Sequence, residues 1–348
     1  MLPDRDPNPI VRAVALAAVH FSRPDVPSAA RFFEDLGLEP VQVAKDSAAL
    51  RGCAESRPSV RLKRGPAAFD GITLQLATMD DIRTLANARS VPVKRDGEAL
   101  IIQLVDPNGL PVRAEWSPES SPTLPTPIGR NSPVSTVRVN RQAHEAAPVK
   151  VYRIGHAQLG TGRLERTLNW YQKTFGMIVS DFQVIQGQSV PIVAFMRFDR
   201  GDTPTDHHSL AFGSALELGH GHTAFEVYDA GEVLRAHAAL ADRHRHAWGI
   251  GRHDQGSQIF DYWRDDEGSC FELYADGDVF DAHHRAGVSA FTGGSIYAWG
   301  PEPTAAFLGI DNPLRVARQV VSGLLKSDDL TVGRLVALLQ ASRITGRA

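Results

Sequence analysis

The chain has few cysteines, no long apolar run and little net charge. Its two cysteines, Cys53 and Cys270, cannot build a disulfide framework, so we expect a reducing, cytoplasmic location. Residues 1–6 lack the apolar core of a signal peptide, and no apolar stretch is long enough to cross a bilayer. A net charge of −3 gives no electrostatic reason to bind nucleic acid or an anionic membrane. We therefore expect neither kind of partner.

The length of the chain and its histidine content are informative. Its 348 residues are enough for two domains with sizeable cores. A hydrophobic content of 43% and a charged content of 22% are typical of a soluble globular protein. The 13 histidines are unevenly spread, because eight of them lie between His207 and His253. This region is where we look first for a functional site.

Strand and helix periodicities divide the chain into four parts. Two similar α+β units are separated by a stretch rich in proline, serine and threonine, with one short strand expected at 134–139. A tail follows, with helices expected over 314–325 and 332–339, and we predict no chemistry in it. The four predicted parts are a first module at 10–116, a linker at 117–149, a second module at 150–280 and the tail at 281–348.

The second α+β unit repeats the first. The helix expected over 28–36 matches one expected over 163–175, and the turn at Asp106–Gly109 matches the turn at Asp265–Gly268. Two copies of this length indicate a duplicated domain and not a solenoid.

The second unit also repeats within itself. His156 precedes the helix over 163–175, and His222 precedes a helix near 231–243. His156 lies 52 residues before His208, and His222 lies 50 residues before Glu272. Each half is therefore predicted as a strand, a helix and three strands, with a polar residue on its first and last strands. Two such halves facing each other would bring four polar groups toward one point.

Glu272 indicates a cation at that point. It lies between Phe271 and Leu273, and burying its carboxylate unpaired would cost several kcal/mol. His156, His222 and Glu272 are the candidate ligands. Two neutral imidazoles and one carboxylate on the same side of a metal suit a non-haem Fe(II) that keeps open positions for a substrate and O2.

These motifs resemble the catalytic module of the type I extradiol ring-cleavage dioxygenases, of the vicinal oxygen chelate superfamily. The steps of 19 residues from His253 and 10 residues from Tyr262 to Glu272 fit the family pattern. The resemblance covers residues 10–300 and implies two tandem modules, each a pair of βαβββ units that form an open barrel-like sheet around a cavity. The matching segments are Gly155-His156, His207–Phe212, His222–Val227, Gly251–His253, Phe260–Tyr262 and Phe271–Tyr274.

The resemblance also implies roles and partners. Fe(II), with Mn(II) as the alternative, would be bound by His156, His222 and Glu272. The substrate would be a small aromatic diol of the catechol type, cleaved beside its hydroxyls with insertion of both atoms of O2, and the chain would form a homo-oligomer. The catalytic residues would be His208 as the acid/base group and His253 and Tyr262 as hydrogen-bonding partners of the substrate oxygens.

Some positions depart from the pattern or leave it open. In the first module, Arg113 stands where Glu272 stands in the second and Ala17 falls near the position of His156, so that module cannot hold the same metal. His207 and His220 leave single assignments open by one or two positions, and we expect His207 to point to the opposite side of its strand from His208. The segment Arg243–His246 is expected to be a solvated helix end.

Two other functions remain open at this stage. One is a different metal enzyme on the same scaffold, a glyoxalase or epimerase, which would use more carboxylate or glutamine ligands. The histidine at position 208, where such an enzyme would have a carboxylate, argues against it. The other is a binding protein that sequesters a small molecule, which needs no metal triad.

Overall fold

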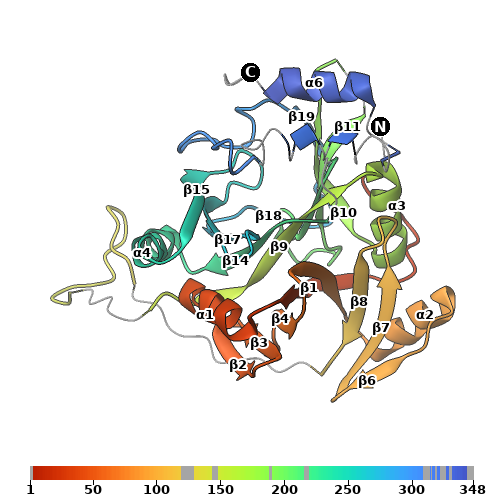
Figure 1. Cartoon of the computed structure of the whole chain (residues 1–348), viewed down its shortest axis with the longest axis horizontal. Coiled ribbons are helices and arrows are strands. Elements are labelled where there is room, and N and C mark those ends of the chain that lie inside the picture. The colour runs from red at the N-terminus through yellow and green to blue at the C-terminus, as the bar shows by residue number, and fades with distance from the viewer. Residues whose placement is uncertain are drawn as a thin grey trace.

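The structure is a computed structural model, and Figure 1 shows its arrangement. It describes residues 3–118, 129–142, 148–187, 190–214, 219–308 and, beyond these, 314, 316–317, 320–321, 327–328 and 331–342. Within this part of the chain, no helix is long and apolar enough to span a membrane.

The first module is built on an eight-stranded sheet in the order β2-β3-β4-β1-β5-β8-β7-β6. Helix α1 (Val26–Leu36) follows β1, and helix α2 (Met79–Arg89) follows β5. The strands are β1 (Ala13–Arg23), β2 (Glu39–Val43), β3 (Ser47–Arg51), β4 (Val60–Arg64), β5 (Ala68–Leu76), β6 (Lys94–Asp96), β7 (Ala99–Val105) and β8 (Pro111–Trp116).

The second module is built on a nine-stranded sheet in the order β15-β16-β17-β14-β9-β13-β11-β10-β19. Helix α3 (Leu164–Phe175) follows β9, and α4 (Ala230–Leu240) follows β14. The strands are β9 (Val151–Thr161), β10 (Ile178–Val184), β11 (Pro191–Arg197), β13 (Leu210–Ser214), β14 (Gly219–Val227), β15 (Arg245–Arg252), β16 (Ile259–Arg264), β17 (Cys270–Ala275) and β19 (Gly287–Ala290). A small ribbon pairs β12 (Thr205–Asp206) with β18 (Val279–Phe280).

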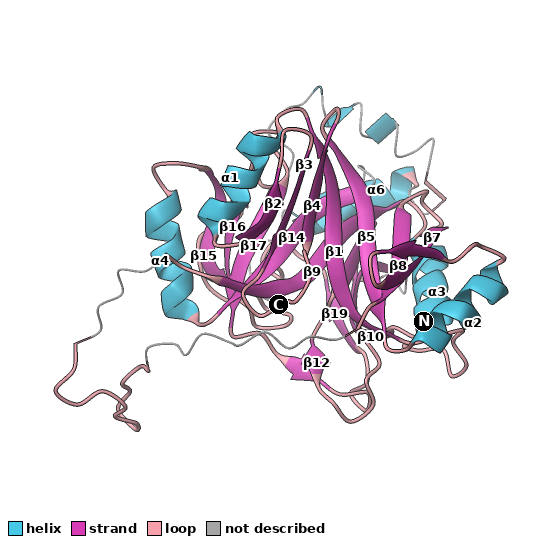
Figure 2. Cartoon of the chain, turned by 90° about the horizontal axis from the view of Figure 1, so that it is seen from below, coloured by secondary structure: helices cyan, strands magenta, loops and turns pink. Residues whose placement is uncertain are grey.

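This order confirms the predicted α+β fold of two modules, each a pair of βαβββ units. In each module the first strands of the two halves pair antiparallel, β1 with β5 and β9 with β14. The sheets curve, and helices lie at the outer sides of the molecule (Figure 2). The exact residue bounds of the modules stay a prediction.

Local sequence signals explain where the helices begin and end. The Asp25 side chain accepts a hydrogen bond from the amide of Ser28 at the start of α1. Gly37 ends that helix with a φ of 108°, a left-handed conformation that favours glycine. Asp229 caps α4 in the same way through the amide of Glu232.

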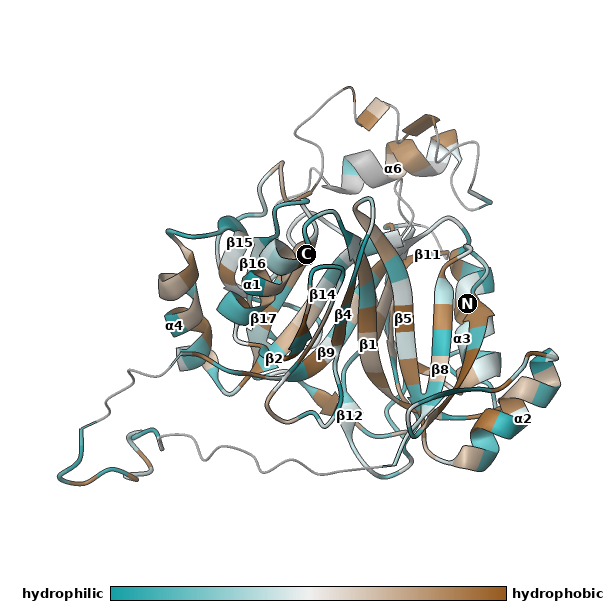
Figure 3. Ribbon diagram, turned by 60° about the horizontal axis from the view of Figure 1, so that its bottom comes forward, coloured by the Kyte–Doolittle hydropathy of each residue, from teal (hydrophilic) through white to brown (hydrophobic). Residues whose placement is uncertain are grey.

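Two local predictions are wrong. The segment over 134–139 forms no strand, because Val134 is 95% exposed there and the backbone makes only an isolated bridge between Ser132 and Ser135. Residues 129–142 are mostly hydrophilic and extend away from both sheets (Figure 3). Arg243–His246 is not a solvated helix end either, because α4 ends at Leu240 and β15 begins at Arg245.

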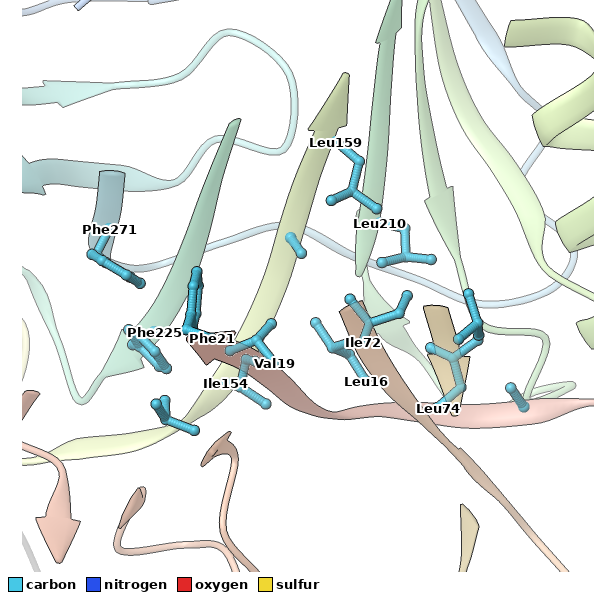
Figure 4. Close-up of a cluster of buried hydrophobic side chains, with 14 of the residues drawn as sticks. Leu16, Val19, Phe21, Ile72, Leu74, Ile154, Leu159, Leu210, Phe225 and Phe271 are labelled. Carbon is cyan, nitrogen blue, oxygen red and sulfur yellow. The ribbon is translucent and has the colours of Figure 1, made fainter. Parts of the chain in front are cut away.

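One hydrophobic core joins the two modules. Phe21 of β1 packs against Phe271 of β17 with ring centroids 5.5 Å apart, and Phe33 of α1 packs against Phe271 at 4.9 Å. Figure 4 shows side chains of β1 and β5 lying beside Ile154, Leu210 and other residues of the second module. The strands that support the site of the second module therefore rest on the first module.

A buried ion pair reinforces this contact. The Arg23 guanidinium donates to Asp265 Oδ2 from Nε at 2.9 Å and from Nη2 at 2.7 Å, and it also donates to Ser269. Both charged side chains are almost fully buried. Removing one partner of such a pair typically costs about 3–5 kcal/mol, because the other charge is left buried and unpaired. The pair joins β1 to the turn before β17.

The tail packs on the second module. Strand β19 extends the sheet beside β10, and Ala337 of α6 (Val332–Ser342) packs near Ile185 and Ile192. Figure 1 shows α6 above β11 and β19, on the side away from the first module. The helix predicted over 332–339 is confirmed, and most of the one predicted over 314–325 lies outside the described residues.

Candidate metal centre

Three neighbouring strands bring His156, His222 and Glu272 together. In the strand register, Ala224 of β14 pairs with His156 of β9 on one side and with Glu272 of β17 on the other. His222 lies two residues before Ala224 and therefore points to the same face of the sheet. The junction between the two halves of the module is where their polar residues meet.

The three side chains have the spacing of ligands around one metal ion. His156 Nε2 lies 3.1 Å from His222 Nε2 and 3.2 Å from Glu272 Oε2, and His222 Nε2 lies 3.4 Å from the same oxygen. Ligand atoms bonded to one metal at about 2.1 Å in adjacent positions would lie about 3 Å apart. The three groups thus form one face of a coordination sphere.

The carboxylate of Glu272 lacks the partners that a buried charge requires. The residue is fully buried, and neither oxygen receives a hydrogen bond of good geometry from the described residues. Burial alone would raise the pKa of this carboxyl group, but the nearby imidazole of His156, and then that of His253, hold its pKa well below the usual value. A buried, ionised carboxylate whose oxygens lack hydrogen-bond partners, beside two candidate imidazole ligands, fits a divalent metal ion.

His222 is in the protonation state that metal binding requires. Burial lowers the pKa of His222 to about 3, against the opposing effect of the Glu272 charge. The imidazole is therefore neutral at neutral pH, and a nitrogen lone pair is available for a metal.

A cavity of about 240 Å³ adjoins the three side chains. Its lining includes His156, His222 and all three predicted catalytic residues, His208, His253 and Tyr262. The remaining lining residues are amides and apolar side chains, with no lysine or arginine among the described ones. They are Gln158, Gln183, Val193, Phe195, Ala211, Trp248, Gln255, Gln258, Phe291, Ile296 and Phe307.

His208 lies against the candidate ligands without joining them. Its ring centroid is 4.2 Å from that of His156, and it is not one of the three side chains whose ligand atoms converge. Burial, followed by the neighbouring His156, lowers the pKa of His208 well below its usual value. This imidazole is therefore neutral at neutral pH.

His207 does not point away from His208, so that prediction is wrong. The two Nδ1 atoms are 2.9 Å apart, and His207 Nε2 lies 2.6 Å from Asp181 Oδ2. Both histidines precede β13, which begins at Leu210, so the side-chain alternation of a strand does not apply to them. A carboxylate only accepts hydrogen bonds, so His207 Nε2–H donates to Asp181. With His207 in its neutral form, His207 Nδ1 accepts from His208 Nδ1–H, which leaves His208 Nε2 as the nitrogen without a proton.

His253 and Tyr262 form a second hydrogen-bonded pair at the cavity. His253 Nδ1 donates to the carbonyl oxygen of Ile296 at 2.7 Å, so Nε2 accepts from the Tyr262 hydroxyl at 2.8 Å. His253 Nε2 is also 3.7 Å from Glu272 Oε1. Burial raises the pKa of Tyr262 well above its usual value, so the hydroxyl keeps its proton.

The structure also settles the residues whose assignment the sequence left open. His220 points toward the first module, where its ring packs 4.7 Å from Phe69 and 5.1 Å from Phe21, and it is not a candidate ligand. The strand register shows which residues correspond in the two modules. In the second module, Ala224 is the common partner of Glu272 and His156. In the first module, Thr73 is the common partner of Arg113 and Ala18. Arg113 thus matches Glu272 as predicted, and the match to His156 is Ala18, one residue from the predicted Ala17.

The tail contributes to the site, contrary to the prediction that it has no chemistry. Phe291, Ile296 and Phe307 form part of the cavity wall, and the Ile296 carbonyl orients His253. The backbone of Arg252 bonds to Trp299, which holds this segment over the end of β15. The aromatic residues of the segment at 291–307 are the sequence signal that could have indicated a pocket wall.

Comparisons with known proteins agree with this arrangement. Residues 153–273 match the family described as the Glyoxalase/Bleomycin resistance protein/Dioxygenase superfamily. A curated relative, metapyrocatechase 2 of Cupriavidus necator, is 29% identical over 242 residues, which are 69% of this chain and 71% of the relative.

Two solved structures have a similar fold. An extradiol ring-cleaving dioxygenase from B. fuscum superposes with a TM-score of 0.68 at 17% identity, over 88% of this chain and 84% of the other. A Mn(II)-bound glyoxalase from Novosphingobium aromaticivorans has the same TM-score at 18% identity, over 85% of this chain and 94% of the other.

The fold and the matched residues show what this protein is similar to: residues 153–273 match the Glyoxalase/Bleomycin resistance protein/Dioxygenase superfamily. Within that superfamily, the predicted resemblance to the type I extradiol dioxygenases is confirmed.

Replacing Glu272 tests the candidate centre. We expect Glu272→Ala to lose most of its bound iron, because the change removes the only anionic group among the three candidate ligands. Glu267→Ala is the matched control, since Glu267 lies exposed in the turn before β17. Metal content after dialysis, measured by elemental analysis, checks the expectation. Equal and full occupancy in both variants would show that the metal binds elsewhere.

Proposed function

We propose that the protein is an Fe(II)-dependent extradiol dioxygenase that cleaves the ring of a catechol with insertion of both atoms of O2. The observation that most supports the proposal is the group His156, His222 and Glu272, whose ligand atoms converge beside a cavity of about 240 Å³. The similarity to metapyrocatechase 2 supports the same reaction class. When held by these three residues, Fe(II) would supply open positions for a chelating diol and O2 and a path for electrons between them.

The residues around the cavity divide the proton chemistry. In this proposal His208 Nε2 accepts a proton from a diol hydroxyl and returns it to the product, because its imidazole is neutral and unprotonated on that side. His207 and Asp181 hold His208 in that tautomer. Tyr262, kept protonated by burial, and His253 hydrogen-bond the oxygens of the substrate.

The cavity favours an uncharged catechol. Phe195, Trp248 and Phe307 provide flat apolar walls for an aromatic ring. The glutamines of the lining can hydrogen-bond a polar substituent, but no lysine or arginine of the described lining can neutralise a carboxylate. A carboxylated catechol would therefore lose its hydration without gaining a countercharge.

A glyoxalase is the competing function, since a Mn(II)-bound glyoxalase shares the fold. The donor set favours the dioxygenase. His208 lies just before β13, the last strand of the first half of the module. Its Nδ1 is hydrogen-bonded to His207 and through it to Asp181, and His208 is not among the converging ligands. Two imidazoles and one carboxylate leave more of the metal open than a four-ligand set does.

The proposed reaction can be tested with protein loaded anaerobically with Fe(II). We expect 3-methylcatechol to consume one O2 per ring and to give a ring-opened product that absorbs visible light. A carboxylated catechol should show a kcat/KM lower by about 10-fold or more, because its charge finds no partner in the cavity. Loading with Mn(II) shows which metal supports turnover. Absence of O2 uptake with every catechol, in protein that holds its metal, would rule the proposal out.

The acid/base assignment predicts different effects at two adjacent histidines. His208→Gln should keep its metal and lose turnover by about 10²–10⁴-fold, the usual contribution of general acid/base catalysis. His207→Gln should lose about 10–100-fold, since it disturbs only the orientation of His208. The exposed His283, replaced by Gln, is the control and should change nothing. Turnover and metal content are measured together. If His207→Gln is as active as the control, the hydrogen-bonded chain from Asp181 has no catalytic role.

A further inference from the structure

A second group of metal-binding side chains lies on the other face of the same sheet. It consists of His237 on α4, His246 on β15 and Asp261 on β16. His237 Nδ1 lies 3.1 Å from Asp261 Oδ2, and His246 Nε2 lies 2.8 Å from Asp261 Oδ1. Asp261 precedes Tyr262, and because side chains alternate along a strand, Tyr262 faces the cavity while Asp261 faces α4.

The group of His237, His246 and Asp261 is buried on one side and open to solvent on the other. Asp261 is fully buried, whereas His237 is 35% exposed and His246 is 33% exposed. The carboxylate thus forms the floor and the two imidazoles form the rim. Water has access to the side opposite the floor and could complete the coordination of a small ion.

The surroundings of Asp261 orient its carboxylate. Trp263 Nε1 donates to Asp261 Oδ2 at 2.8 Å, and the Trp263 ring packs 4.9 Å from that of His246. A Cβ atom at Gly249 would lie 2.8 Å from Asp261 Oδ1, so the absence of a side chain there leaves room for the carboxylate. A hydrogen bond to a ligating carboxylate is the usual outer support of a metal site.

We propose that His237, His246 and Asp261 bind a second divalent transition-metal ion, such as Zn²⁺, independently of the proposed catalytic centre. Two imidazole nitrogens and one carboxylate, with their ligand atoms within 4.8 Å of one another, suit an ion of borderline softness that keeps water as a further ligand. Ca²⁺ and Mg²⁺ are disfavoured because they prefer oxygen ligands.

The three ligands come from three elements, so the ion would act as a cross-link. It would join α4 to the strand pair β15 and β16, on which His253 and Tyr262 depend for their positions. Because the ion binds only the folded arrangement, it would raise the unfolding temperature. In the absence of metal, the two imidazoles serve Asp261 as hydrogen-bonding partners.

Counting bound Zn²⁺ tests the site. In equilibrium dialysis of the metal-free full chain against Zn²⁺, we expect two ions in the unchanged protein and one in Glu272→Ala. His246→Gln should also bind one, and the double variant with Glu272→Ala should bind none. His244→Gln is the matched control, because His244 belongs to the same segment but contacts Asp35.

The outcomes separate this proposal from the proposed catalytic centre. One ion in the unchanged protein and none in Glu272→Ala would overturn the second site and leave the first intact. Retention of the second ion in His246→Gln would place that ion elsewhere and overturn the assignment. If a variant fails to fold, the number of Zn²⁺ ions bound by the unchanged protein still shows whether a second site exists. A rise in the unfolding temperature of Glu272→Ala on adding Zn²⁺ is the supporting measurement.

Discussion

The charge of Glu272, held in a strand whose every residue is buried, is the constraint on which the second module depends. A carboxylate at that place would be strongly destabilising alone, and the fold supplies it with His222 from the adjacent strand β14 and His156 from the next strand, β9. Those two strands meet only because the halves of the module pair antiparallel along their first strands. The internal duplication of the module therefore determines where the charged group of Glu272 finds its partners.

The first module shows what the same geometry does without this constraint. With Ala18 and Arg113 at the matching positions, its strands contain no equivalent group, and Arg113 pairs instead with Asp96 and Glu115. Its contribution is structural support. Phe21 of β1 packs on Phe271 of β17, and Arg23 of β1 forms an ion pair with Asp265 in the turn between β16 and β17. The module that lacks the ligands thus holds in place the strand that provides the carboxylate.

The sequence predicted the convergence of His156, His222 and Glu272 because strand spacing and internal repetition are encoded locally. It did not predict the bond between His207 and His208, since the point at which β13 begins cannot be read from alternation in a short apolar segment. His246 was expected at a helix end, and its pairing with Asp261 depends on the end of α4 and the register of β15 and β16. The cavity wall provided by Phe291, Ile296 and Phe307 depends on how the tail returns over the sheet, and the aromatic residues of this segment do not by themselves specify that path.

The central claim is that one iron held by three residues keeps adjacent open positions toward the cavity. Electron paramagnetic resonance of the anaerobic Fe(II) protein with nitric oxide, before and after adding a catechol, tests it most directly. We predict a high-spin iron–nitrosyl signal that changes shape with catechol and keeps its intensity, because diol and diatomic ligand bind together. Loss of the signal on adding catechol, or no response to it, would contradict the account.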